Sequence, residues 1–347
     1  MKLALALLAL LLGAVSASSA EPVSFAGKTI TNIVVSAPGG GTDGAARVIA
    51  AFLTKHLPGN PAVIVKNVPG AQGITAMNYF VKQVAPDGLT IITASNTQGD
   101  PALFRAPQSQ FDPTKLPVVG GAGRGGSVLV ISKEAEARLR DKSKPPAIMG
   151  SLAGVPRSGH QMAAWGIGFL DWNAKWVVGY PGTSQLTIAL ERGEIDMNST
   201  SNLFAIQQML VTGRFKILSQ TGDVKNGVNV GRAEFGDAPL ITTLMEGKLK
   251  TPVEKQAFTY WAAITALDKW VALPPGTPQP IVDTYRQTYK KAFTDPEFVA
   301  MGKKISEDFE PMAWDDITQL IKNLGDTSPE ALAFTNEMLQ KQGIQRE

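Results

Sequence analysis

The sequence predicts an α/β protein of two lobes, each a mainly parallel sheet flanked by helices, with a cleft between the lobes. Its 347 residues are 44% hydrophobic and 18% charged, a composition typical of globular chains. The length exceeds the ~250–300 residues at which a single hydrophobic core stops growing, which favours two domains. Short β-rich runs alternate with helical segments, the pattern of parallel sheets covered by helices.

The first lobe is predicted from three strands joined by two helices. Residues 29–36 are rich in Ile and Val and form a buried strand. After a glycine turn, residues 45–57 place apolar side chains at spacings of four, which is one face of a helix. Residues 62–65 and 89–94 are the second and third strands, with a glycine-rich turn at 67–73 before the intervening helix. This β-α-β-α-β order predicts right-handed, parallel connections.

The second lobe is predicted to begin after a crossover rich in proline and glycine at residues 111–126. Its strands are expected at 128–132, 176–180, 194–197 and 216–220, with a helix at 185–192. A later amphipathic helix carries Ile281, Tyr285 and Tyr289. We expect residues 21–123 and 266–347 to form the first lobe and residues 124–265 the second. A chain that crosses twice between lobes forms a hinge around a cleft.

The first twenty residues predict a signal peptide. Lys2 supplies a positive charge, residues 3–15 are almost all Ala and Leu, and Ser18, Ser19 and Ala20 form a small-residue cleavage site. The apolar run is shorter than the ~20 residues that span a bilayer. We expect cleavage after Ala20, a mature chain that begins at Glu21, and a periplasmic location.

Composition and motifs disfavour several functions. The formal net charge is +3 without a long run of like charges, so we expect no nucleic-acid partner. The chain has no cysteine and two histidines, His56 and His160, and it lacks the hydrolase, zinc-protease and Walker A motifs. Glu191, Glu194 and Asp196 cluster, but solvated charges explain them better than glycosidase chemistry. We therefore expect no catalytic residue, no metal site and no cofactor.

Two glycine-rich turns predict an anion site. Gly39, Gly41 and Gly44 match G-x-G-x-x-G between a strand and a helix, but no acidic residue follows from Gly44 to Pro86, so a dinucleotide site is disfavoured. Backbone N–H groups in such a turn, together with a helix N-terminus, bind anions. Asp43 has two compatible interpretations: N-cap of a helix that starts at Gly44, or acceptor of a ligand hydrogen bond.

These turns carry a family resemblance that spans most of the chain after residue 20. The matching segments are Ile33 to Val35, Ala37 to Asp43, Ala46-Arg47, Val65 to Asn67, Pro69 to Ala71, Ala85 to Gly88, Asn96, Pro101 to Phe104, Gly179 to Gly182, Gly193 to Asp196 and Pro275 to Pro278. The sequence resembles the periplasmic solute-binding proteins of tripartite tricarboxylate transporters, the TctC or Bug family. The resemblance implies a type II-like periplasmic binding protein that closes on a small organic carboxylate. It also implies delivery of that ligand to membrane permease subunits, by a monomer.

The resemblance also implies the ligand-binding residues. They are Gly39, Gly40, Gly41, Thr42 and Asp43 in the first turn; Gly70, Ala71, Gln72 and Gly73 in the second; Ser95, Asn96 and Thr97 after the third strand; and Gly182, Thr183, Ser184 and Asn198 in the second lobe. At the far end of the ligand we expect Thr183, Ser184 or His160 to select among carboxylates; for His160 a capping or packing role is the alternative. Two other functions remain open, a periplasmic sensor for a membrane kinase and, less favoured, a secreted hydrolase.

Overall fold

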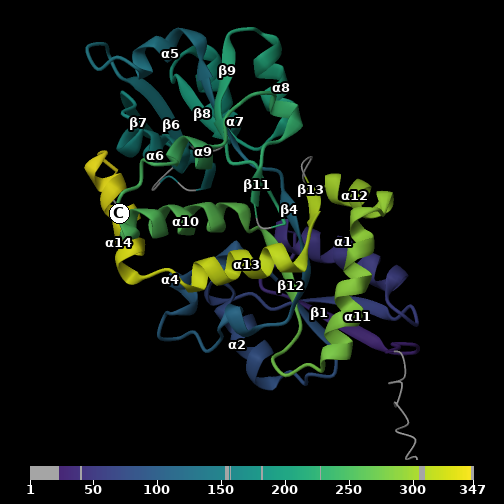
Figure 1. Cartoon of the computed structure of the whole chain (residues 1–347). Coiled ribbons are helices and arrows are strands. Elements are labelled where there is room, and N and C mark those ends of the chain that lie inside the picture. The colour runs from purple at the N-terminus through teal and green to yellow at the C-terminus, as the bar shows by residue number, and fades with distance from the viewer. Residues whose placement is uncertain are drawn as a thin grey trace, which may run out of the picture.

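The computed structural model describes residues 23–39, 41–152, 156, 158–180, 183–226, 228–304 and 309–344. The predicted signal peptide, residues 1–20, lies outside this range. Two sheets, A and B, occupy separate lobes, with sheet A in the lower lobe of Figure 1 and sheet B in the upper one. Within the described ranges, no helix combines the length and the apolar character that a membrane crossing requires.

Sheet A has six strands in the order β13-β4-β12-β3-β1-β2. They are β1 (Thr29–Val34), β2 (Ala62–Asn67), β3 (Thr90–Ser95), β4 (Val118–Arg124), β12 (Lys269–Ala272) and β13 (Phe309–Met312). The strands β1, β2 and β3 pair in parallel, as the β-α-β-α-β pattern predicts. The strands β12, β4 and β13 pair antiparallel, so the sheet is mixed rather than mainly parallel.

The strand β4 corrects the prediction of a crossover at residues 111–126. The glycines of β4 make its sequence resemble that of a loop. In the structure, each of them lies where a neighbouring group occupies the space of a Cβ atom. A Cβ at Gly120 would overlap the ring of Tyr289, and one at Gly121 would overlap the backbone of Lys269 and the side chain of Ile317. The glycines therefore let helices pack closely on both faces of the strand.

Helices cover both faces of sheet A. In chain order they are α1 (Gly41–His56), α2 (Ile74–Gln83), α3 (Asn96–Gly99), α4 (Pro101–Phe104), α11 (Gln279–Lys290), α12 (Pro296–Lys303) and α13 (Trp314–Gly325). The helices α1, α11 and α12 bury a cluster around Phe52, Tyr285 and Phe298 on one face. The helices α2 and α13 bury a cluster around Phe80 and Ile317 on the other. This layering is the α/β fold class that the alternation of strands and helices predicts.

Sheet B has five strands in the order β7-β6-β8-β5-β9. They are β5 (Val128–Ser132), β6 (Ala147–Leu152), β7 (Ala174–Tyr180), β8 (Met197–Thr200) and β9 (Phe215–Gln220). The strands β6, β7 and β8 are parallel, and β5 is antiparallel to β8 and β9. The helices are α5 (Lys133–Leu139), α6 (Gln161–Phe169), α7 (Thr183–Arg192), α8 (Leu203–Val211) and α9 (Ile241–Met245). The helices α5, α6 and α9 pack on one face, and α7 and α8 on the other.

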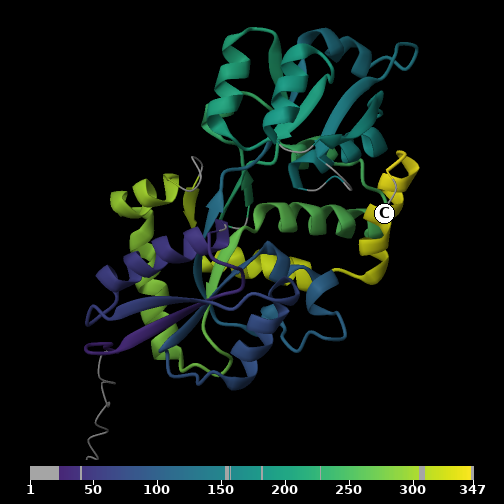
Figure 2. The ribbon, with the colours of Figure 1, turned by 180° about the vertical axis from the view of Figure 1, so that it is seen from behind.

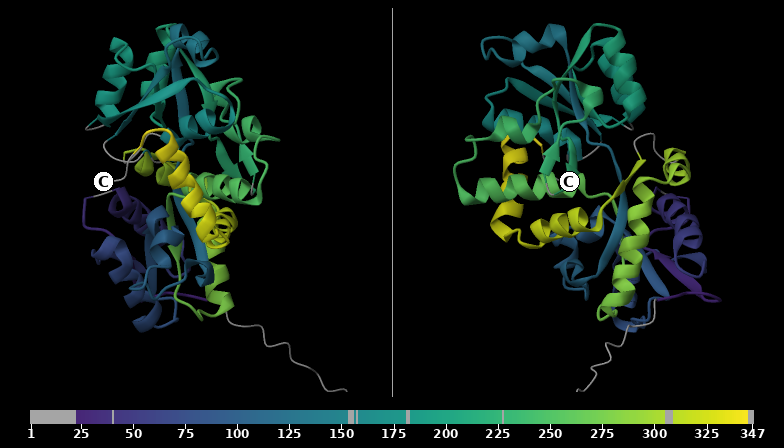
Figure 3. Two further views of the ribbon diagram at one scale, coloured as in Figure 1. Left: turned by 90° about the vertical axis from the view of Figure 1, so that its left-hand side faces the viewer. Right: turned by 45° about the vertical axis from the view of Figure 1, so that its right-hand side comes forward.

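The helix α10 (Pro252–Ala266) lies between the lobes, as Figures 2 and 3 show from the back and from two sides. Thr251 and Glu254 form a capping box at its start, which fixes where the helix begins. It packs against α13 and against α14 (Pro329–Lys341). Although α14 falls in the range 266–347, its buried Ala331 and Met338 belong to the cluster beside sheet B.

The chain between the lobes is held by polar contacts. The backbone N–H of Gly126, between β4 and β5, donates to Asp223 Oδ1 at 3.0 Å. Asp223 begins the hairpin of β10 (Asp223–Lys225) and β11 (Val228–Val230). The buried Arg232 donates from Nη1 to the Gly126 carbonyl oxygen at 3.4 Å. The crossing from β4 to β5 is therefore tied to the hairpin of the second lobe.

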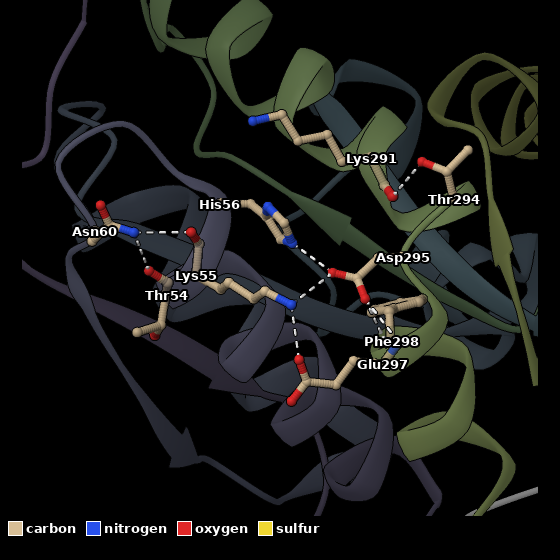
Figure 4. Close-up of polar contacts among 9 residues, drawn as sticks. All are labelled: Thr54, Lys55, His56, Asn60, Lys291, Thr294, Asp295, Glu297 and Phe298. Carbon is tan, nitrogen blue, oxygen red and sulfur yellow. Dashed lines mark hydrogen bonds and ion pairs between the residues drawn. The ribbon is translucent and has the colours of Figure 1, made fainter.

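A polar cluster joins two helices of the first lobe that are far apart in sequence (Figure 4). Asp295 caps α12 by accepting from the backbone N–H groups of Glu297 and Phe298 at 2.8 and 3.2 Å. Its other oxygen accepts from His56 Nε2 at 2.6 Å and from Lys55 Nζ at 3.4 Å, both in the last turn of α1. Hydrogen bonding by His56 is the largest cause that lowers the pKa of Asp295 to about 2. His56 therefore has a structural partner in the first lobe.

Candidate functional site

Three turns of the first lobe meet at one edge of sheet A. The strands β1, β2 and β3 are parallel, and Val34 of β1 pairs with Asn67 of β2 and Thr93 of β3. The turns that follow these strands therefore leave the sheet at the same edge, where open α/β sheets bind ligands. The predicted residues of the first lobe lie beyond the ends of these strands, apart from Ser95, which is the last residue of β3, and Gly40, which lies outside the described residues.

Asp43 is not the N-cap of a helix that starts at Gly44. The helix α1 begins at Gly41, and the buried Asp43 lies in its first turn. Its carboxylate accepts from the Gly39 N–H at 2.9 Å, from Asn67 Nδ2 at 2.9 Å, and from Arg47 at 3.0 and 3.1 Å. Burial raises the pKa of Asp43, but these hydrogen bonds outweigh burial and hold it below its ordinary value. Asp43 thus holds the turn in place, and Arg47 offsets its charge.

The second turn has an unusual backbone. Gly70, Ala71, Gln72 and Gly73 have φ values of 137°, 46°, 54° and 88°. Positive φ at two consecutive non-glycine residues costs energy and persists only where the surroundings impose it. Here the surroundings include Gln98, whose Nε2 donates to the Gln72 carbonyl oxygen at 2.6 Å.

Gln98 joins the second turn to the third. Its Oε1 accepts from the Ser95 backbone N–H and from Ser95 Oγ, both at 3.0 Å. The Ser95 carbonyl oxygen accepts from Trp270 Nε1 at 2.9 Å. Gln98 and Asn67 were not predicted as site residues. The Ser-x-x-Gln spacing of 95–98 is a capping-box signal that could have identified Gln98.

The edge formed by these turns presents backbone rather than charge. Gly39, Gly41, Gly70, Ala71 and Gln72 are exposed, and none carries a charge. The N-terminus of the sixteen-residue α1 lies in the same turn, and the first N–H groups of a helix have no intrahelical acceptor. Such donors, with the partial positive charge of the helix end, suit an anion such as a carboxylate.

The second lobe contributes a turn at Ser158–His160 and the strand β8. The turn packs against β8, and Gly159 is needed there because a Cβ would overlap Ser199 and Ser127. Asn198 and Ser199 of β8 are 1% and 3% exposed. Asn198 Oδ1 and Ser199 Oγ have no hydrogen-bond partner among the described residues.

The remaining predicted residues of the second lobe are only partly described. The backbone of Thr183 and Ser184 begins α7, while Gly182 lies outside the described residues. The half-buried His160 is the last residue of the Ser158–His160 turn. It therefore lies beside β8, on the turn that also carries Gly159.

The helix α10 contacts a turn of each lobe that carries predicted residues. Trp261 Nε1 donates to the Ser158 carbonyl oxygen of the second lobe at 3.0 Å. One turn further along the helix, the Ile264 carbonyl oxygen accepts from Asn96 Nδ2 of the first lobe at 3.5 Å. Residues three apart lie on the same helical face, about 4.5 Å apart along the axis. The Asn96 turn and the Ser158–His160 turn are therefore held side by side on one helix.

The structure gives Asp196, one of the clustered carboxylates of the second lobe, a structural role. Asp196 accepts from Arg138 Nη2 at 2.6 Å and from the Ile148 N–H at 2.8 Å. It directly precedes β8, which starts at Met197 rather than at Glu194 as the sequence suggested. In the described part of the chain, no three His, Cys, Asp or Glu side chains are grouped to hold a metal ion.

No family model matches the chain. It is 30% identical over 290 residues to a UPF0065 protein of Bordetella pertussis, covering 82% of each chain. A solved TctC solute-binding protein from Polaromonas has a similar fold, with a TM-score of 0.66, 17% identity, and coverage of 92% of this chain and 100% of that one. An R. palustris protein solved with adipate gives a TM-score of 0.52 at 20% identity, covering 92% and 98%. By its likeness to the Bordetella protein, the chain belongs to the UPF0065 family, the Bug/TctC family of solute-binding proteins.

Proposed function

We propose that this protein is a periplasmic solute-binding protein that holds a small organic carboxylate between its lobes and delivers it to a tripartite tricarboxylate-type transporter. The observation that carries the proposal is α10, which positions the Asn96 turn of one lobe beside the Ser158–His160 turn of the other. Family membership and the adipate bound by the R. palustris protein support a carboxylate as the ligand.

In this proposal the first lobe binds one carboxylate through backbone donors. The exposed residues of the two turns carry no charge of their own: Gly39, Gly41, Gly70, Ala71 and Gln72. Each charge-assisted hydrogen bond contributes roughly 1.5–3 kcal/mol. Ser95, Asn96 and Thr97 extend the same edge. The second lobe recognises the far end of the ligand through Asn198, His160 and the first turn of α7, which includes Thr183 and Ser184.

The export signal and the partner are part of the same proposal. The predicted signal peptide at residues 1–20 places the mature chain in the periplasm, beside the permease subunits of the transporter. The protein binds and releases its ligand unchanged: the two histidines serve as a helix-to-helix contact, at His56, and as part of the second-lobe turn, at His160.

Binding is tested by thermal unfolding against a panel of mono-, di- and tricarboxylates, both aliphatic and aromatic. A ligand at a hundred times its Kd stabilises the folded protein by about 2.7 kcal/mol. We expect the midpoint temperature of unfolding to rise with one class of carboxylate only. If no carboxylate of the panel raised the midpoint temperature of folded protein freed of endogenous ligand, the proposal that the ligand is a carboxylate would be wrong.

Gly41→Val locates the site without straining the backbone. A Cβ at Gly41 has no atom within 4 Å, so the added side chain projects into the open space at the start of α1. We expect at least a tenfold loss of affinity with little change in stability. Gly168→Ala in α6, where the new methyl group makes ordinary contact with Met338, is the matched control and should bind normally. Equal ligand affinity in the two variants would show that the first turn is not part of the binding site.

A further inference from the structure

The second lobe contains a cavity of about 270 Å³ away from the turns described above. Its lining comes from the end of α5, the loop between α6 and β7, the strand β9, and α9 with the loop that follows it. The apolar part is formed by Leu170, Trp172, Leu218, Pro239 and Leu244, and two cations, Arg140 and Lys248, complete the lining. The lining is therefore mostly apolar and includes two positive charges.

The local backbone fixes the walls of this cavity. Asp171, between Leu170 and Trp172, has a φ of 60°, a conformation that non-glycine residues rarely adopt. The N–H groups of Leu170 and Trp172 both donate to the Gly166 carbonyl oxygen, at 2.9 and 3.3 Å. Gly166 has no room for a Cβ because the Trp172 ring lies directly against it. The aromatic wall is thus formed before any ligand arrives.

The opposite wall is anchored to sheet B. Gln220 of β9 donates from its backbone N–H to the Pro239 carbonyl oxygen at 3.0 Å. Its side-chain Nε2 donates to the Ala238 carbonyl oxygen at 2.8 Å. These bonds hold the segment that leads into α9, which carries Leu244. Sites for small molecules are commonly preformed in this way.

The polar groups of the cavity point to an anion. Arg140 and Lys248 are exposed, and neither forms an ion pair with the described residues. The nearby carboxylate of Asp171 is paired with Lys142. Trp172 is 3% exposed, yet its indole N–H has no acceptor in the described ranges. Two cations without a partner among the described residues are complementary to a carboxylate.

We propose that this cavity is a second binding site, separate from the one between the lobes, for a small amphipathic carboxylate. The ligand's apolar chain lies among the leucines and the Trp172 ring, and its carboxylate lies between Arg140 and Lys248. The volume is just under the roughly 300 Å³ at which common ligand pockets begin. A medium-chain fatty acid is therefore the class of ligand that this site fits.

The test is calorimetric titration of the purified protein with octanoate, octanol and octylamine. We expect octanoate to bind, and octanol and octylamine to bind at least tenfold more weakly, because the site requires an anion. Leu244→Trp fills the cavity from a half-buried position and should abolish binding of octanoate. Gly41→Val, in the first lobe, should leave it unchanged. Loss of binding in Gly41→Val but not in Leu244→Trp would place octanoate between the lobes and overturn the proposal.

Two milder variants test the polar contacts. Lys248→Met keeps much of the length of the side chain but removes the charge, and should lower the affinity for octanoate about fivefold. Arg140→Met removes the other charge of the lining and should weaken octanoate binding by a similar factor. Lys255→Gln, at an exposed cation on α10, is the control and should bind as the wild type does. Equal affinity of all four proteins for octanoate, or equal binding of octylamine and octanoate by the wild type, would also overturn the proposal.

Discussion

The two lobes satisfy their polar groups differently at the edges that form the proposed site. In the first lobe, Asp43 accepts four hydrogen bonds from the chain itself, and Gln98 connects two turns. In the second lobe, Asn198 Oδ1 and Ser199 Oγ are buried without a partner among the described residues. The first-lobe turns are therefore held by their own side chains, whereas the second-lobe edge keeps buried side-chain oxygens without a partner among the described residues.

This difference suggests a division of roles. Turns held by their own side chains present the same backbone donors whatever ligand arrives, which suits the carboxylate group common to all candidate ligands. A buried polar atom without a partner costs free energy until something pairs with it. The second lobe therefore gains most from a ligand with a matching group, and we assign the choice among carboxylates to it.

The largest expected effect is at Gln98, where the first-lobe turns depend on one side chain. Gln98→Leu leaves the Gln72 carbonyl oxygen and the Ser95 N–H without their partners. Because each lost partner costs about 1–3 kcal/mol, we expect the free energy of unfolding to fall by about 2–6 kcal/mol. Ligand affinity should fall as well, since the turn at 70–73 relaxes. Urea unfolding and titration with the ligand measure the two effects.

The exposed Gln207 on α8 provides the control for Gln98→Leu. Gln207→Leu should change the free energy of unfolding by no more than about 0.5 kcal/mol, as surface substitutions usually do. If Gln98→Leu were as mild as this control, the first-lobe turns would not depend on Gln98, and the contrast between the lobes would fail.

Asp295 tests whether lost stability alone weakens binding. It lies in the first lobe but contacts the last turn of α1, at the opposite end from the proposed site. Asp295→Ala removes the cap of α12 and the contact with His56, and should cost about 2 kcal/mol with unchanged ligand affinity. The pKa of Asp295 in the folded protein is about 2. The contribution of its charge to the free energy of unfolding is therefore complete above about pH 4 and is lost as the pH falls toward 2.

Unfolding of wild type and Asp295→Ala at several pH values checks this window. The difference in free energy should be constant from pH 7 to about 5 and should narrow below pH 4. A difference that persists at pH 2 would mean that the cap, and not the charge, accounts for the effect. A large loss of ligand affinity would mean that stability and binding are not separable in this lobe.

A smaller effect is expected at Asp43. Asp43→Asn keeps the shape of the side chain but removes the charge that Arg47 and the Gly39 N–H bind, and should cost about 1 kcal/mol. The folded pKa of Asp43 lies below its ordinary value, so the charge stabilises the protein at neutral pH. That contribution disappears as the pH falls through the folded pKa. The stabilities of wild type and variant should therefore approach each other as the pH falls, as urea unfolding at a series of pH values from 7 downward would show.

The first half of the first lobe was predictable because its signals are local. The strand, glycine turn and helix at 29–57 follow one another in sequence, so periodicity predicts them with small errors at the ends. The start of α1 was placed three residues late because Asp43 looked like an N-cap, whereas its actual partners include Asn67, 24 residues away.

Long-range pairings could not be predicted in the same way. The strand β4 contains Gly120, Gly121 and Gly123, and a glycine-rich run reads as a loop until Tyr289 and Ile317 are seen to occupy the space. Its partners β12 and β13 lie more than 140 residues further along the chain. The bridging role of α10 likewise depends on contacts with Asn96 and Ser158, which no local pattern reveals.

The smallest expected effect on stability, and the sharpest test of the contrast between lobes, is at Asn198. Asn198→Leu is close in shape and removes the unpartnered Oδ1, and the paired residue on β5 is the apolar Val130. Replacing an unsatisfied buried polar group with an apolar one is near neutral or stabilising, so we expect the free energy of unfolding to rise by up to about 1 kcal/mol. Ligand affinity should nonetheless fall, because the variant lacks the Asn198 Oδ1 acceptor with which a donor group of the ligand pairs. In the first lobe, by contrast, Gln98→Leu should lower stability and affinity together. Urea unfolding and ligand titration of both variants compare the lobes directly, and a destabilised Asn198→Leu that binds normally would show that this side chain serves the fold rather than the choice of ligand.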